Sequence, residues 1–199
     1  MIRLGLIRHA RTPWNQEKRI QGSTDIPLSP EGQEEAARWG EVLTSEPFDA
    51  ILSSPLTRAR ETALILSDRM GIPLCVDMDL REQDFGDWEG QRITEIREKD
   101  PRAVEFQESR GWEFRPPGGE SRIRVLERVT KAFERAAKTF ENQYILVVTH
   151  QSVIKILIYD ALKRTFGPDE TPLLKDYCLH DLLWDGTLRI QEINRLRLK

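Results

Sequence analysis

The sequence predicts an α/β fold, a three-layer α/β/α sandwich around a mainly parallel central sheet. Short apolar β-runs alternate with amphipathic helical stretches along the whole chain. Two of the β-runs end in a histidine, His9 and His150. The 199 residues, 39% hydrophobic and 32% charged, fit one globular domain of ordinary size. We therefore expect residues 1–199 to form a single domain.

The first strand and the first helix flank a polar loop. An apolar β-run over residues 2–7 opens the chain and stops at Arg8-His9, and a turn-rich segment follows it. Ser29 is a good N-cap, and Pro30 suits the first helical position. These two residues predict a helix that runs to about Thr44.

A second strand and helix follow at residues 49–53 and 56–70. One helical face is apolar, at spacings of three and four: Leu56, Ala59, Ala63, Leu66 and Met70. Gly71 and Pro73 are expected to end this helix. Residues 74–76 form a third short β-run.

The middle of the chain is irregular. Residues 81–120 contain one short helical pattern, near residues 93–98, and are otherwise rich in turns. A connection of this length is usually functional, so we expect this segment to form a cap beside a functional site.

The C-terminal part returns to regular alternation. An amphipathic helix is marked by Leu126, Val129, Phe133, Ala136 and Phe140, and a strongly apolar strand spans residues 144–148. A further helix follows His150, with its inward face at Ile154, Leu157, Ile158 and Ala161. Two short strands near residues 179–184 and 187–193 complete the predicted fold.

The composition excludes several classes of protein. A formal net charge of −3 favours neither a nucleic-acid nor a membrane partner. The first residues resemble neither a signal peptide nor a membrane span, and Cys75 and Cys178 lie far apart without a CxxC motif. A cytoplasmic protein is the expectation. The sequence allows a homodimer without determining the oligomeric state.

The two strand-terminal histidines are the first candidates for chemistry. In open α/β sheets, ligands bind beyond the carboxyl ends of the strands. His9 and His150 both fall at such ends, and Arg8 directly precedes His9. His180 has no such position, and we interpret it as structural.

Short motifs surround these histidines in a fixed order along the chain. They are Arg8-His9-Ala10-Arg11 with Thr12-Pro13-Trp14-Asn15, Gln21-Gly22, Ser53-Ser54-Pro55-Leu56-Thr57-Arg58, Leu80-Arg81-Glu82, Pro117-Gly118-Gly119-Glu120-Ser121 and Val147-Val148-Thr149-His150. Together they resemble the histidine phosphatase superfamily, the phosphoglycerate mutase-like proteins. The resemblance implies a phosphoglycerate mutase-like fold and a phosphatase that acts on a small phosphomonoester.

The resemblance also implies a role for each matching residue. His9 would attack phosphorus and form a phosphohistidine that water hydrolyses, which splits one difficult step into two. Its other ring nitrogen is expected to donate to a backbone carbonyl. Glu82 matches the family's proton donor to the leaving oxygen.

The remaining matches imply a phosphate pocket that needs no metal and no cofactor. Arginine suits this pocket because its planar fork can donate two hydrogen bonds to phosphate oxygens. Free N–H groups of the helix after His150 should add to it. The expected phosphate-binding residues, besides the catalytic His150, are Arg8, Arg58, Asn15, Gln21, Gly22 and Gln151.

Each of these residues also has a structural interpretation. Arg58 could pair with Glu61 or Thr62 on its own helix, and Asn15, Gln21 and Gly22 could be ordinary turn residues. Arg60 lies about 200° around the helix from Arg58, so both should not enter one pocket. Glu89 and Asp84 are interpreted as surface or structural carboxylates. The aromatic residues near the middle segment could line the pocket rim or belong to the core: Trp14, Phe85, Trp88, Phe106, Trp112 and Phe114.

Two rival phosphatase signatures overlap in one segment. Cys75 to Arg81 reads C-x5-R, but its loop has no glycine and contains two carboxylates that would repel phosphate. Asp77-Met78-Asp79 reads D-x-D, but Arg81 stands where such enzymes usually carry a small residue. The three scattered histidines show no metal-ligand spacing.

The main alternative lies within the family, a cofactor-dependent phosphoglycerate mutase. Mutases of this family are usually longer and carry an arginine pair in the middle region that grips the substrate carboxylate. Here residues 112–117 contain a single arginine, Arg115, so the pair is missing. Residues 116–121 resemble the corresponding segment of the phosphatase branch, which includes α-ribazole phosphatase and broad-specificity phosphatases.

Three positions depart from the commonest family pattern: Ala10, Arg11 and Gln151. The Arg11 and Gln151 side chains either face solvent, or narrow the pocket and favour a leaving group with a second anionic or polar group; the second interpretation is our hypothesis. The identity of the substrate does not follow from the sequence.

Overall fold

The computed structural model describes residues 1–167 and 170–199. Within them the strands form one six-stranded sheet in the order β3-β2-β4-β1-β5-β6. The strands are β1 (Ile2–Arg8), β2 (Ala50–Ser53), β3 (Leu74–Val76), β4 (Tyr144–Thr149), β5 (Cys178–Trp184) and β6 (Leu188–Arg197). The first four are parallel to one another, and β5 and β6 add an antiparallel edge. The predicted mainly parallel sheet is confirmed.

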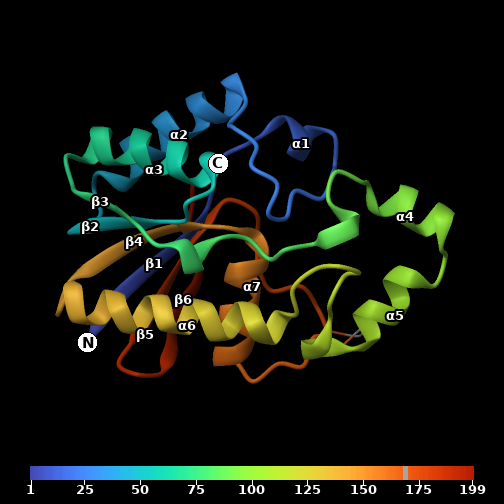
Figure 1. The fold of residues 1–199 in the computed structure, drawn as a ribbon. Coiled ribbons are helices and arrows are strands. Elements are labelled where there is room, and N and C mark those ends of the chain that lie inside the picture. Colours follow the sequence, from blue (N-terminus) through green and yellow to red (C-terminus); the bar gives the residue numbers. More distant parts are fainter. Residues whose placement is uncertain (168–169) are drawn as a thin grey trace.

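Helices cover both faces of this sheet (Figure 1). Helices α2 (Pro30–Leu43) and α3 (Thr57–Met70) pack on one face, and α6 (Arg122–Thr139) and α7 (Gln151–Ala161) pack on the other. Successive residues of β1 point to opposite faces, so Leu6 joins the core under α6 and α7 while Ile7 joins the core under α2 and α3. Burial on both faces explains why β4 is apolar along most of its length.

The local signals that predicted helix boundaries are present in the structure. The Ser29 hydroxyl accepts a hydrogen bond from the Gly32 N–H at 3.1 Å, and Pro30 begins α2. Gly71 ends α3 with φ +68°, a left-handed conformation that costs glycine little.

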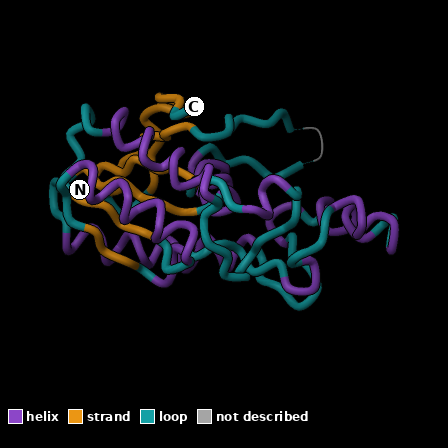
Figure 2. The backbone as a smooth tube through the Cα atoms, turned by 90° about the horizontal axis from the view of Figure 1, so that it is seen from above, coloured by secondary structure: helices purple, strands orange, loops and turns teal. Residues whose placement is uncertain are grey.

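The segment between β3 and α6 forms a cap at one end of the sheet (Figures 1 and 2). Its elements are the 3-10 helices η1 (Met78–Leu80), η2 (Gly86–Trp88) and η3 (Gly111–Glu113) and the helices α4 (Ile93–Lys99) and α5 (Ala103–Ser109). The short helix expected near residues 93–98 is α4. The sequence interpretation missed α5, and it missed α1 (Pro13–Gln16) in the preceding loop. The cap has its own small core of Trp88, Ile96, Val104 and Phe114.

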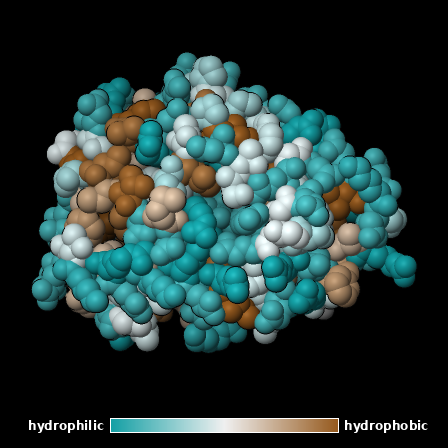
Figure 3. Space-filling view, in the orientation of Figure 1, coloured by the Kyte–Doolittle hydropathy of each residue, from teal (hydrophilic) through white to brown (hydrophobic). Residues whose placement is uncertain are grey.

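The surface contains few large apolar side chains. Figure 3 shows hydrophobic residues gathered over the sheet edge where β3 lies, and Val76 and Met78 of this region are exposed. Among the described residues, no helix combines the length and apolarity that crossing a membrane requires.

Candidate active site

Parallel pairing of β1 with β4 places the two histidines side by side. Arg8 and Thr149 are register partners, and the His9 N–H donates to the Thr149 carbonyl at 3.0 Å. The His9 and His150 rings lie 5.3 Å apart between centroids, at 59°. Both rings are buried. The strand ends therefore meet at the sheet's carboxyl edge, as the sequence predicted.

The His9 ring is oriented by its own backbone neighbour. Its Nδ1 lies 2.7 Å from the Ala10 carbonyl oxygen, which can only accept, so Nδ1 carries the proton. The lone pair is then on Nε2. Burial, and the nearby charges of Arg8 and Arg58, hold the pKa of His9 well below 6.5. A neutral ring with a free Nε2 is the state a nucleophile needs.

Arg58 crosses from α3 beneath the loop that follows α1. It is fully buried, and its Nη1 and Nη2 donate to the carbonyls of Thr24 at 2.8 Å and Gly22 at 2.7 Å. These bonds replace the pairing with Glu61 or Thr62 that was the alternative. Burial lowers the pKa of Arg58 to about 10, so a nearby anion would stabilise its charge.

Two buried arginine N–H groups and one buried histidine nitrogen in this region have no hydrogen-bond partner among the described residues. They are Nε of Arg8, Nε of Arg58 and Nδ1 of His150. Unpaired buried donors are costly, and a phosphoryl group between them would supply the missing acceptors. The Nε2 of His150 is hydrogen-bonded to the Ser54 hydroxyl at 2.7 Å, which fixes the ring. Burial lowers the pKa of His150 as well.

Gln21 and Gly22 lie in the loop that Arg58 supports. The Gln21 Oε1 is buried and has no hydrogen-bond partner among the described residues. A flip of the Gln21 side-chain amide would put its NH₂ group, a donor, in the place of this oxygen. Gly22 has φ +53°, and a Cβ there would lie 2.0 Å from the Glu89 carboxylate. Glu89 accepts the N–H groups of Ser23 at 2.6 Å and Thr24 at 2.9 Å. Glu89 is therefore structural, as interpreted from sequence.

The Glu82 carboxylate lies against the start of α7. Its Oε2 accepts from the Ser152 N–H at 3.3 Å, and its Oε1 accepts from the Gln83 N–H at 2.8 Å. It is only 9% exposed. The structure thus brings Glu82 to the helix that begins directly after His150.

Arg128 of α6 holds the backbone around Glu82. Its guanidinium donates to both carboxylate oxygens of Glu120, each at 2.9 Å. The same group donates to the carbonyls of Arg81 at 2.7 Å and Glu82 at 3.0 Å. The Gln83 amide donates to the Glu120 carbonyl at 2.7 Å. Sequence reasoning did not single out Arg128, because nothing local links residue 128 to residue 82.

Two expected site residues are engaged elsewhere. The Arg11 Nε forms an ion pair with Glu35 of α2 at 3.2 Å, so the expectation that Arg11 narrows the pocket is wrong. The Asn15 Oδ1 accepts from the Thr12 N–H at 2.9 Å and caps α1. A phosphate-binding role for Asn15 therefore stays a prediction. Arg60 is exposed on the opposite face from Arg58, as expected.

The rival signatures do not form sites. Cys75 is exposed on the edge strand β3. Asp77 and Asp79 both accept from Arg135 of α6, at 2.7 and 2.6 Å. Within residues 1–167 and 170–199, no group of three or more His, Cys, Asp and Glu side chains could hold a metal ion.

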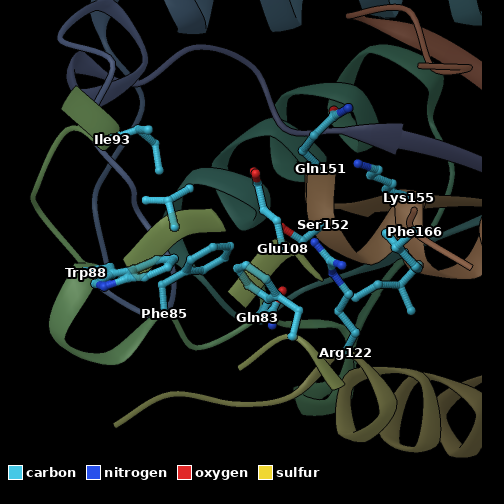
Figure 4. A pocket seen from close by; sticks show the side chains of 13 residues that line it. Gln83, Phe85, Trp88, Ile93, Glu108, Arg122, Gln151, Ser152, Lys155 and Phe166 are labelled. Carbon is cyan, nitrogen blue, oxygen red and sulfur yellow. The ribbon is translucent and has the colours of Figure 1, made fainter. Parts of the chain in front are cut away.

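A cavity of about 200 Å³ opens beside Gln83, Gln151 and Ser152. Figure 4 shows its two sides: Trp88, Phe85 and Ile93 on one, and Gln151, Lys155 and Arg122 on the other. Gln151 lines this cavity, whose lining does not include His9, Arg8, Arg58 or His150, so a phosphate-binding role for Gln151 stays a prediction. Sequence reasoning missed Arg122 and Lys155. Their only signals were their positions, directly after the Gly-Gly-Glu-Ser motif and one helical turn after Gln151.

The chain belongs to the histidine phosphatase superfamily (branch 1), whose family model matches residues 4–188. The predicted family is confirmed, and so is the prediction that the protein is a phosphatase. The chain is similar to Bacillus stearothermophilus YhfR, with a TM-score of 0.88 and 31% identity over 100% of this chain and 99% of that one.

Two further relatives are named for their activities. The mycobacterial glucosyl-3-phosphoglycerate phosphatase Rv2419c, in complex with VO3, superposes with a TM-score of 0.85 at 29% identity and covers 96% of this chain and 98% of that one. A 2,3-bisphosphoglycerate-dependent phosphoglycerate mutase 2 of Gloeobacter violaceus is 32% identical over 185 residues, 90% of this chain and 84% of the relative.

Proposed function

We propose that this protein is a phosphomonoester hydrolase that acts on a small phosphorylated metabolite through a phosphohistidine at His9. The observation that supports it best is the neutral, buried His9 ring with Nδ1 tied to the Ala10 carbonyl, beside the unpaired Nε–H groups of Arg8 and Arg58 and the unpaired Nδ1 of His150. An entering phosphoryl group would satisfy these donors while it faces the Nε2 lone pair.

Each step has a group to perform it. The Nε2 of His9 attacks phosphorus, and the bond from phosphorus to the ester oxygen breaks. Arg8, Arg58 and His150 hold the charge on the three phosphoryl oxygens. Glu82 gives its proton to the departing oxygen, so the product leaves as an alcohol. Water then attacks the phosphohistidine and releases inorganic phosphate.

The direct test of the nucleophile is trapping of the covalent intermediate. Wild-type protein quenched in base after brief mixing with ³²P-labelled phosphomonoester should carry a base-stable, acid-labile label, as a phosphohistidine does. His9→Ala should carry none. His180→Asn is the matched control, since the Asn oxygen can replace the His180 Nδ1 that accepts from Asn194. Label on folded His9→Ala, or label that is stable in acid, contradicts the proposal.

Metal independence belongs to the same proposal, because none of the steps uses a metal ion. A chelator should leave the rate of phosphate release unchanged. Loss of activity in chelator that a divalent ion restores would favour a metal-dependent mechanism instead.

Hydrolysis is proposed over mutase activity because residues 112–117 lack the arginine pair expected of mutases. Incubation with 3-phosphoglycerate and a trace of 2,3-bisphosphoglycerate should give little 2-phosphoglycerate. Isomerisation much faster than phosphate release would replace the hydrolase by the mutase named among the relatives. A cytoplasmic location and a homodimer stay predictions of the sequence.

A further inference from the structure

The cavity beside the site has two chemically different walls. The cap supplies an apolar wall of Phe85, Trp88, Ile93, Val104 and Phe114. The opposite wall carries Arg122 at the start of α6 and Lys155 on α7 (Figure 4). A second cavity of about 190 Å³ shares Glu108, Arg122, Lys155 and Phe166 with the first, so the two cations and Glu108 lie where the cavities meet.

The Arg122 guanidinium is held in an apolar clamp. Its Cζ lies 4.2 Å from the Phe114 ring centroid and 4.1 Å from that of Phe166. Among the described residues its one hydrogen bond is from Nη1 to the Gly111 carbonyl, at 2.7 Å. Burial lowers the pKa of Arg122 to about 10. Its planar fork is thus fixed between two rings with donors to spare.

Lys155 adds a second positive charge to the same wall. It is half-buried, and burial, together with the charge of Arg122, lowers its pKa. In the part of the chain that the structure describes, neither cation forms an ion pair within 4.0 Å. Two partly desolvated cations on one wall are stabilised by an incoming anion.

We propose that this cavity receives the leaving group of the phosphomonoester, and that Arg122 and Lys155 select a leaving group with an apolar body and a carboxylate. The inference rests on the proposed phosphatase function. Gln151 lies next to His150, and Lys155 follows Gln151 by four residues, about 6 Å along the helix axis. A leaving group that extends from His9 past Gln151 therefore reaches Lys155.

The local charge favours a carboxylate over a second phosphate. Glu108 of α5 in the cap lines the same cavity, so the lining of this first cavity carries two positive charges and one negative. The net charge of one matches a single carboxylate. The flat guanidinium also matches the planar carboxylate fork. The apolar wall of the cap would then cover an aromatic or aliphatic body.

The test uses three aryl phosphates that differ only at the far end: 3-(4-phosphonooxyphenyl)propanoate, its primary amide, and 4-(3-aminopropyl)phenyl phosphate. The propyl spacer keeps the phenol leaving groups alike. Wild type should show kcat/KM about tenfold or more higher for the acid than for the amide, the effect of one charge-assisted hydrogen bond. The amine should be the poorest substrate.

Variants then assign the preference to residues. Lys155→Gln and Arg122→Gln should each move the acid-to-amide ratio toward one, and Glu108→Gln should raise it. Lys131→Gln, an exposed lysine of α6 about 13 Å along the helix from Arg122, should leave the ratio unchanged. Lys155→Gln keeps the test decisive if loss of the clamped Arg122 harms folding.

The outcomes separate this inference from the function it rests on. Equal kcat/KM for acid and amide in wild type, or a ratio that neither Lys155→Gln nor Arg122→Gln lowers, overturns the carboxylate selection while phosphatase activity stands. Preference for the amine overturns it too. Failure to hydrolyse any of the three compounds or 4-nitrophenyl phosphate overturns the phosphatase proposal itself.

Discussion

Replacement of Arg128 by methionine tests how the fold positions the proposed general acid. The variant keeps an apolar stem of similar length but removes the guanidinium that joins Glu120 to the carbonyls of Arg81 and Glu82. We expect the Glu82 carboxylate to lose its fixed position, because its own backbone is no longer held. The chemistry at His9 does not use Arg128 and should persist.

The size of the effect follows from these contacts. Breaking a buried ion pair from one side costs about 3–5 kcal/mol; with the Glu120 side chain 13% exposed, about 3 kcal/mol is expected. For a chain of this length that lowers the Tm by about 6–12 °C. A misplaced catalytic group costs about 10²-fold in rate, so alkyl phosphates should lose about that in kcat/KM. Activated aryl phosphates, which need little proton donation, should lose only a few-fold.

The assay compares an alkyl phosphate with 4-nitrophenyl phosphate at a temperature where both proteins are folded. Arg135→Met on the same helix is the control, since Arg135 is half exposed and its pairs with Asp77 and Asp79 are worth about 1 kcal/mol or less. Arg128→Lys should rescue only part of the loss, because an ammonium cannot bridge Glu120 and the three carbonyls of Asp79, Arg81 and Glu82. If Arg128→Met slows both substrates equally, Arg128 does not act through Glu82.

Three further predictions concern other parts of the molecule. Glu82→Gln should slow alkyl phosphates about 10²–10⁴-fold and activated aryl phosphates far less, and equal losses would limit Glu82 to a positional role. Burial lowers the pKa of His180 in the folded protein to about 4, whereas the unfolded chain has the ordinary value of about 6.5. As the pH falls from 6.5 to 4, only the unfolded chain binds a proton at His180. The free energy of unfolding therefore decreases over this range, by up to about 3 kcal/mol. Urea titrations should show this slope reduced in His180→Asn; an unchanged slope would mean that His180 is not its source. Gln151→Gly should broaden the range of phosphomonoesters that the protein hydrolyses, because Gln151 lines the cavity. Arg11→Gln should leave the relative activities on the same panel unchanged, because Arg11 is paired with Glu35. The reverse result would contradict the observed side-chain positions.

The sequence alone determined the parts of this protein that local patterns encode. Ser29 and Pro30 start a helix through their own backbone chemistry, and Gly71 ends one because it accepts a left-handed conformation. The apolar strands ending in His9 and His150 predicted a shared sheet edge, because parallel strands present their carboxyl ends together. The family motif selected Arg58, and burial of that side chain agrees with the choice.

Only the tertiary structure decided which side chains face the pocket. Arg11 lies two residues from His9 in sequence, yet it pairs with Glu35 because α2 packs against the start of that loop. Arg122 and Arg128 lie 40 or more residues from Glu82, yet one lines the adjoining cavity and the other holds the Glu82 backbone. Periodicity and capping signals indicate only which helix or strand a residue belongs to. Contacts between distant segments depend on how those elements pack, because each contact is selected by the shape and charge of a partner that no local pattern contains.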